Sequence, residues 1–558
     1  MGGRILVPMR PVRLAAPALL ALLPLRAQAP LKVEAKEIRL QNGARVLVVE
    51  RPGTGAFQAT LCFRGGASEE PPGLHGANAL LARALYGATL PVDLEEATRA
   101  QEELAAQEDT LREALRLERK RLERGSGSEA RATELEVDLK GLRARRRNGT
   151  TPSLLTDLYR SVGGNTQARV GQDALTFSAQ LPGDQLEAFL RTETRRLQTL
   201  RLARLPEARE ELVAHLRSPS RDRGPGLLAS AALPGHPYGQ DPLGTPSTLE
   251  SIRTSDLRAF ARARLVPDRM LLVLVGEVGS APLTPLLERT LGTLRAQEAP
   301  EPALADLDEE VGERRFQVQS GDRDRLLLAW RVPPRNHPDY LPLRALLGCL
   351  VEGPSSRLAQ RLVDRGLARS VSGSLGAEGA RQLALLQVEV QPADGVGLAT
   401  LEGAVAAEVL RLQQEPPPLR EWQRRVQQAD LEAALLLQSP AGLAQGLALA
   451  WAETGDWRPL LSLPERLARL GPEAVQAVAR KYLVNGQRTV AYLSAELTAF
   501  DPVETAAAEV LGALARRRLE DPAQVEAVVS EGLRQLRMLP REDRERTVRL
   551  LQDQVKPR

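Results

Sequence analysis

Cysteine, histidine and aromatic residues are all scarce in this chain. Its 558 residues include 2 cysteines and 4 histidines, and aromatic side chains make up only 3%. A framework of several disulfides is therefore excluded. Cys62 and Cys349 could form one bridge, but we expect two buried thiols. Because few aromatic rings are available, leucine and alanine must fill most of the core.

An excess of charge of one sign is also missing. The chain has 75 lysines and arginines against 71 aspartates and glutamates, which gives a formal net charge of +4. No run of basic residues is interleaved with aromatic residues, so the sequence does not favour nucleic-acid binding. The hydrophobic content of 43% is ordinary for a soluble globular protein.

Apolar runs of membrane-spanning length are missing after the N-terminus. The N-terminal segment has three arginines, an apolar run and a small-x-small sequence: Arg4, Arg10 and Arg13, then Leu14 to Leu25, then Ala27-Gln28-Ala29. This pattern predicts a cleavable secretory signal over residues 1–29. The apolar run is too short to span a bilayer comfortably, which speaks against an anchor. We expect a secreted, periplasmic protein with no membrane span after signal removal.

Length and local composition divide the chain into several parts. A chain of 558 residues should hold about three or four domain-sized units. Residues 94–147 have leucines at helical spacing on both sides of a Gly-Ser break, which predicts a helical hairpin in the form of a short coiled coil. That hairpin is either a docking arm or a solvated insertion, and we favour the insertion. Residues 294–313 are typical of a linker, and residues 501–558 predict a charged helical tail.

Strand-like and helix-like segments fill the remainder as two similar units. Residues 33–64 predict strands, and the stretch from Gly76 to Thr89 predicts a helix. The segments that follow in the first unit are Gly163-Gly164-Asn165-Thr166, the strand Asp173 to Pro182, His236-Pro237-Tyr238-Gly239 and the buried strand Met270 to Val278. Those of the second unit are the strand Arg325 to Pro333, the helix Tyr340 to Leu350, Gly353-Pro354-Ser355-Ser356, Leu362 to Ala368, and the strands Gln382 to Gln391 and Arg488 to Leu493.

The order and spacing of these segments resemble the insulinase/pitrilysin (M16) family of zinc peptidases over residues 33–495. The resemblance implies an α+β fold of two homologous insulinase-like domains. Each is expected to be a mixed, mostly antiparallel sheet with helices on one face. The first domain would occupy residues 30–293, including the 94–147 insertion, and the second would occupy residues 314–500. The two domains are expected to enclose a large cavity.

In that family, the helix at Gly76–Thr89 carries His-x-x-Glu-His. Its two histidines bind Zn²⁺ from one helix face, and its glutamate activates the bound water. Aligned on Thr89, the histidine positions here are Ala79 and Arg83, and the glutamate position is Ala82. Alanine offers no lone pair, arginine is a permanent cation that repels a dication, and no general base is left.

The third zinc ligand of the family is a glutamate on a later helix. The resemblance places it at His215, and a neighbouring frame would place it at Glu210 or Glu211. We expect His215 to be an ordinary helix residue that faces solvent or a charged partner. An unconventional metal site is an alternative hypothesis, and its candidate ligands are His75, His215, Glu69 and Glu70.

The resemblance also implies an arginine and a tyrosine in the second domain that hold substrate in active members. Those positions are Val363 and Arg369 here. Arg361 or Arg365 could take part of that role, but no tyrosine is near them in the sequence. Ser372-Gly373-Ser374 lacks the glycines of a nucleophile elbow and is interpreted as a flexible loop. The chain has no phosphate-binding loop and no Cys-x-x-Cys.

Two separate departures from the catalytic pattern predict a non-catalytic chain. The preferred hypothesis is a silent subunit that pairs with an active zinc-peptidase relative and helps to form a peptide-binding chamber. Zinc is then expected only in the partner, and this chain needs no cofactor. A second hypothesis is a stand-alone peptide-binding or scaffold protein of the cell envelope, as a homodimer. A third is an active metalloendopeptidase with a rearranged site.

Overall fold

The computed structural model describes residues 33–86, 95–148, 155–202, 204–278, 282–298, 312–319, 323–376, 380–494, 502–516, 522–537 and 541–555. Residues Glu34–Arg558 form one compact unit. The predicted signal over residues 1–29 lies outside the described residues, as does most of the predicted linker.

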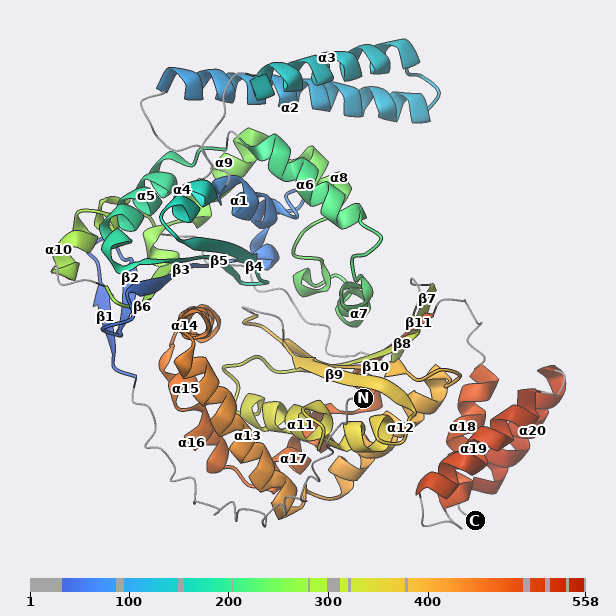
Figure 1. The fold of residues 1–558 in the computed structure, drawn as a ribbon. Helices are drawn as coiled ribbons and strands as arrows, with labels where there is room; N and C mark the ends of the chain where they lie inside the picture. Colours follow the sequence, from blue (N-terminus) through green and yellow to red (C-terminus); the bar gives the residue numbers. More distant parts are fainter. Residues whose placement is uncertain are drawn as a thin grey trace, which may run out of the picture. The chain divides into compact units, whose positions relative to one another are not determined.

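A six-stranded sheet organises the first half of the chain (Figure 1). The strand order is β1-β2-β6-β3-β5-β4, and only the β2–β6 pair is parallel. Central β6 is buried along its whole length, as expected from its continuous run of leucine and valine. The strands are β1 (Ala35–Arg39), β2 (Arg45–Glu50), β3 (Ala56–Arg64), β4 (Asn165–Val170), β5 (Ala174–Pro182) and β6 (Met270–Gly276).

Helices cover one face of this sheet and share one hydrophobic core with it. Their apolar residues recur at helical spacing, so each helix presents one apolar stripe to the sheet. The helices are α1 (Ala77–Tyr86), α4 (Leu155–Ser161), α5 (Leu186–Thr199), α6 (Leu205–Arg217), α8 (Pro246–Ser251), α9 (Thr254–Arg264) and α10 (Leu283–Glu288).

A five-stranded sheet organises the second half, in the order β7-β11-β8-β10-β9. That order repeats β2-β6-β3-β5-β4, including the single parallel pair, here β7–β11. The strands are β7 (Arg314–Gln319), β8 (Arg325–Val332), β9 (Ala368–Leu375), β10 (Ala384–Pro392) and β11 (Arg488–Ser494). The helices are α11 (Tyr340–Val351), α12 (Leu398–Gln414), α13 (Leu419–Gln438), α15 (Arg458–Leu461), α16 (Leu463–Ala468) and α17 (Pro472–Tyr482). The predicted fold class is confirmed in both halves.

Each half also sends one helix to the other half's sheet. α7 (Gly224–Ala232) packs on β8 and β11, where Leu228 and Leu233 join Leu327 and Leu493 in a separate apolar cluster. α14 (Pro440–Thr454) packs on β3, β5 and β6, with Leu447 fully buried. Both sheets are therefore covered on their second face by a helix from the opposite half.

A helical hairpin and a helical tail complete the described chain. α2 (Glu95–Glu123) and α3 (Glu129–Asn148) lie side by side and pack through Leu115, Leu135 and Leu139 (Figure 1). The tail consists of α18 (Pro502–Arg516), α19 (Pro522–Arg537) and α20 (Arg541–Val555), which share a small core.

In the described residues no single helix is long and apolar enough to cross a membrane, although α13 and α14, bent by 106°, pass that test as a pair.

Two local predictions need comment. Ser372-Gly373-Ser374 is not a flexible loop, because it lies within β9 and pairs with Gln387–Glu389 of β10. Gly373 is needed there, since a Cβ atom would come within 2.8 Å of a backbone oxygen and of Val351. The prediction of two buried thiols is confirmed, as Cys62 and Cys349 are both free and buried.

Candidate functional site

Helix α1, which carries the zinc-motif positions, begins under a carboxylate cap. Oε2 of Glu70 accepts the backbone N–H of Gly76 at 2.6 Å, and its Oε1 accepts that of Asn78 at 2.7 Å. These N–H groups have no partner within the helix, and a negative charge suits the helix N-terminus. Gly76 has φ of +94° and no room for a side chain, because a Cβ atom would lie 2.5 Å from Leu249.

Burial and hydrogen bonding have opposite effects on the pKa of the capping residue, Glu70. Burial raises the pKa of Glu70 to about 7, against the lowering effect of the bonds from Asn78 and Gly76. The neighbouring Glu69 is also committed, since it pairs with Arg264 and with Arg269, the latter at 2.5 Å. Both carboxylates that sequence considerations allowed as metal ligands therefore have structural roles.

The three motif positions on α1 differ in their surroundings. Ala79 and Ala82 belong to the hydrophobic core of the first half. Arg83 lies one turn after Ala79 on the same helix face, and 39% of its side chain is exposed. Its Nη1 is 3.8 Å from Oε2 of Glu211 on α6. The position that the family resemblance gives to the second zinc-binding histidine thus holds a cation that faces a carboxylate of the neighbouring helix.

Helix α6 is fixed by a buried arginine. Arg209 donates from Nε to the carbonyl of Leu249 at 3.0 Å and from Nη2 to that of Ile252 at 2.6 Å. Burial lowers the pKa of Arg209 to about 10, and Asp109 of α2 lies 3.7 Å from its Nη2. The middle of α2 therefore supplies a counter-charge to the buried arginine of α6.

The three candidate positions for a third ligand are distributed along α6. Glu210 pairs with Arg143 of α3 at 3.2 Å, Glu211 faces Arg83, and His215 is exposed one turn further on. Of these, Glu211 from the neighbouring frame is the residue that the structure brings to α1. In the part of the chain that the structure describes, no three His, Cys, Asp or Glu side chains are gathered so that they could hold a metal ion.

The second-half positions lie in contacts of their own half. Val363 ends the short π-helical turn Ala359–Val363 and packs against the second core. Arg369 begins the exposed part of β9 and pairs with Asp394. Arg361 is buried beside Glu408, its Nε 3.6 Å from Oε1, and Arg365 is exposed.

The His-Pro-Tyr-Gly sequence links the two halves, a role that the motif alone did not predict. Tyr238 donates its hydroxyl hydrogen to the buried carboxylate of Asp173. The backbone N–H of Arg381, from the second half, donates to Asp173 at 2.8 Å and to the Tyr238 hydroxyl at 2.9 Å. His236 contacts Gln382 through Nε2 at 3.1 Å. Burial and the Asp173 charge raise the pKa of Tyr238, so it stays a hydrogen-bond donor.

Comparisons with known proteins agree with this architecture. A family model described as the Peptidase M16 inactive domain matches residues 251–429. The zinc protease PqqE of Helicobacter pylori is 27% identical over 170 residues, which cover 29% of this chain and 38% of that protein. The match therefore spans little more than a third of that relative's length.

Solved structures extend the likeness to most of the chain, as a likeness of fold. A protease from Helicobacter pylori has a TM-score of 0.65 at 16% identity, covering 83% of this chain and 99% of the other. A chain of complex III2 from Candida albicans has a TM-score of 0.62 at 14% identity, covering 82% and 96%. The fold thus defines the class, a two-domain insulinase-like α+β protein. Within that class the chain is similar in sequence to M16 peptidases over the part that the family model and PqqE match.

Proposed function

We propose that this chain is a non-catalytic M16-like subunit that pairs with an active zinc-peptidase relative and helps to form a peptide-binding chamber. The observation that carries the proposal is the state of α1. Ala79 and Ala82 lie in the core, and Arg83 faces Glu211, within a two-domain fold that is otherwise kept. A cation at the second ligand position opposes the binding of Zn²⁺. Zinc would then be held only by the partner.

Two further points support pairing and export. The Candida albicans chain of similar fold is part of complex III2. The arginine-led apolar segment within residues 1–29 is typical of a secretory signal, and on this proposal it directs the chain to the periplasm.

The test mixes the purified chain with an M16 relative from the same genome that keeps His-x-x-Glu-His. A stable complex by gel filtration, with peptide turnover at least about tenfold above that of the relative alone, is expected. A zinc chelator should abolish this turnover, because the metal belongs to the partner.

Three controls separate the hypotheses. The chain alone should show no peptide turnover with added zinc; turnover that a chelator abolishes would mean an active peptidase. No complex and no change in turnover would contradict the proposal. A homodimer that binds unfolded peptides without cleaving them would support the stand-alone scaffold instead.

A further inference from the structure

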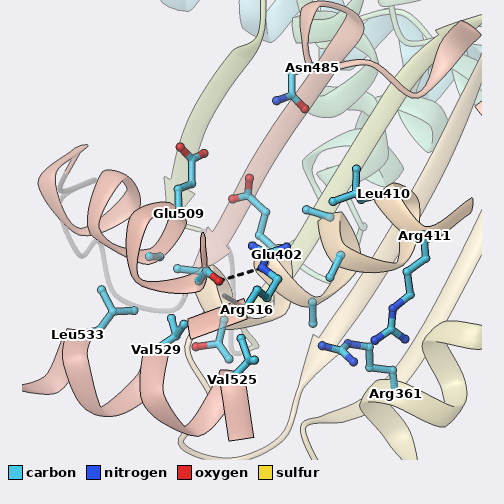
Figure 2. Close-up of a pocket in the computed structure, with 18 of the residues that line it drawn as sticks. Arg361, Glu402, Leu410, Arg411, Asn485, Glu509, Arg516, Val525, Val529 and Leu533 are labelled. Carbon is cyan, nitrogen blue, oxygen red and sulfur yellow. Dashed lines mark hydrogen bonds between the residues drawn. The ribbon is translucent and has the colours of Figure 1, made fainter. Parts of the chain in front are cut away.

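A cavity of about 700 Å³ lies where the C-terminal helices meet the second half of the chain (Figure 2). Its walls come from α12, from β11 and the turn before it, and from α18 and α19. This volume is within the range of small-molecule sites, about 300–1,000 Å³. None of its lining residues belongs to the α1 site, so its role is separate from that of the zinc-motif positions.

The slot between α12 and α19 is apolar. On α12 the lining residues include Ala399, Gly403 and Ala407, which recur every four residues and so share one helix face. A Cβ atom at Gly403 would meet no atom within 4 Å, so this face is open. The opposite wall on α19 consists of Val525, Val529 and Leu533, again four apart.

One end of the cavity is cationic. Figure 2 shows Arg361 and Arg411 together, across from the valine and leucine side chains of α19. Both approach the same atom, Oε1 of Glu408, at 3.6 and 3.0 Å. Arg516 of α18 also lines the cavity, and its Nε donates to the carbonyl of Gly512 at 2.9 Å.

The carboxylate of Glu402, which lines the cavity from α12, is already neutralised by neighbouring side chains. Glu402 accepts hydrogen bonds from Arg315 at 2.5 and 2.9 Å and from the Tyr492 hydroxyl at 2.7 Å. Arg488 approaches it at 3.3 Å. Four arginines and two glutamates line the cavity, and Glu408 pairs with two of those arginines, so an entering group meets a small excess of positive charge beside an apolar slot.

We propose that this cavity binds a small anionic amphiphile. Its apolar chain lies between α12 and α19, and its carboxylate or phosphate head group lies at Arg411, where a charge-assisted hydrogen bond is available. A peptide fits less well, because its amide groups would be buried against alanine and valine without hydrogen-bond partners. The inference does not depend on the proposed pairing, since the chain alone holds every wall.

The test is calorimetric titration of the full chain with dodecanoate, dodecyl phosphate and dodecanol, all below their critical micelle concentrations. Saturable binding of about one anion per chain is expected, with the alcohol bound at least about tenfold more weakly because it lacks the charge. Comparison of the carboxylate and the phosphate identifies the preferred head group. No saturable binding of either anion overturns the proposal, and equal affinity for the alcohol overturns the role of Arg411.

Two variants with matched controls locate the site. Gly403→Leu fills the slot and should reduce affinity at least about tenfold, whereas Gly141→Leu on α3, also in open space, should leave it unchanged. Ala406→Leu tests the same wall if Gly403→Leu does not fold. Arg411→Gln should weaken anion binding about tenfold and leave alcohol binding unchanged, and Arg420→Gln on α13 is its control. Full affinity in both slot variants would place the ligand elsewhere.

Discussion

Arg83 and Glu211 meet at the place where the family resemblance puts a metal between two helices. Their distance of 3.8 Å and their exposure, 39% and 58%, make this a weak ion pair that stabilises the fold by less than about 1 kcal/mol. The pair therefore places opposite charges on the facing sides of α1 and α6, but it is not needed for folding. Replacing it should change the chemistry of the site and leave the fold intact.

The double variant Ala79→His/Arg83→His should gain a zinc site. Its histidines would lie one turn apart on one face of α1, the geometry that such sites need, with α6 opposite. After dialysis against zinc, elemental analysis should find about one zinc ion per chain. The single variant Arg83→His is the control and should retain none.

Two additions to this double variant identify the third position. If Glu211→Ala abolishes zinc retention and His215→Ala does not, the neighbouring frame is the correct alignment. The reverse result supports the frame that ends at His215. Absence of zinc from the double variant itself would contradict the placement of the motif on α1.

The cap of α1 should make stability depend on pH. Glu70 has its pKa raised from 4.5 to about 7 in the folded state, so the folded state binds its proton more tightly than the unfolded state does. Its contribution to the free energy of unfolding is then largest below pH 4.5 and falls as pH rises to about 7. The change is at most about 3.5 kcal/mol, since one pKa unit corresponds to about 1.4 kcal/mol.

Urea unfolding of wild type and Glu70→Gln from pH 4.5 to 8 measures this contribution. In wild type, Glu70 makes the free energy of unfolding fall as pH rises, and Glu70→Gln should lack this part of the fall. The difference in stability between the two proteins should therefore change across that pH range. Glu129→Gln, at the exposed start of α3, should follow the wild type. Parallel profiles for wild type and Glu70→Gln would contradict the assignment.

At the scale of elements, Asp109 makes the hairpin's closest described contacts with α9 and also faces α6. Oδ2 of Asp109 accepts the backbone N–H of Thr254 at 2.7 Å and its hydroxyl at 2.6 Å, which caps the start of α9. The same side chain faces the buried Arg209. Asp109→Ala should therefore lower the free energy of unfolding by about 2–4 kcal/mol, through a lost cap and an uncompensated buried cation.

Asp109→Asn separates those two effects, because it keeps an acceptor for Thr254 but removes the charge. The free energy of unfolding of Asp109→Asn, measured with urea, should lie between those of wild type and Asp109→Ala. Asp138→Ala, exposed on α3, should stay within about 0.5 kcal/mol of wild type. A similarly small effect of Asp109→Ala would mean that the hairpin is not anchored through this residue.

Periodic elements were predictable from the sequence, whereas contacts between distant elements were not. The leucines of α2 and α3 and the apolar run of β6 carry their own period, so local pattern was sufficient. Ser372–Ser374 has no apolar pattern, and only its pairing with β10 makes it a strand. Likewise, the spacing on α6 left Glu210, Glu211 and His215 open, because the choice depends on how α1 crosses α6. The roles of Tyr238 and Asp173 depend on the second half and could not be read locally.

At the scale of the whole molecule, the exchange of α7 and α14 couples the two halves. Arg64 on β3 donates from Nε to the carbonyl of Ala452 at 3.2 Å and lies over the Trp451 ring at 5.5 Å. Gln445 of α14 reaches Thr176 of β5 at 3.4 Å. Without α14, the second face of the first sheet would expose apolar surface to water. This exposure would cost a free energy of about 25 cal/mol for each Å² of apolar surface.

This coupling predicts one cooperative unfolding transition for both halves. Leu447→Ala, in the fully buried part of α14, should cost about 2–5 kcal/mol, because the cavity forms against the first sheet while the helix belongs to the second half. Hydrogen exchange should then quicken in β3 and in β10 by similar factors, since opening either sheet removes a wall of the other. Leu431→Ala, exposed on α13, is the matched control and should change neither strand. Faster exchange in β3 alone would mean that the halves unfold independently, and a chamber formed with a partner would then need that partner to hold them together.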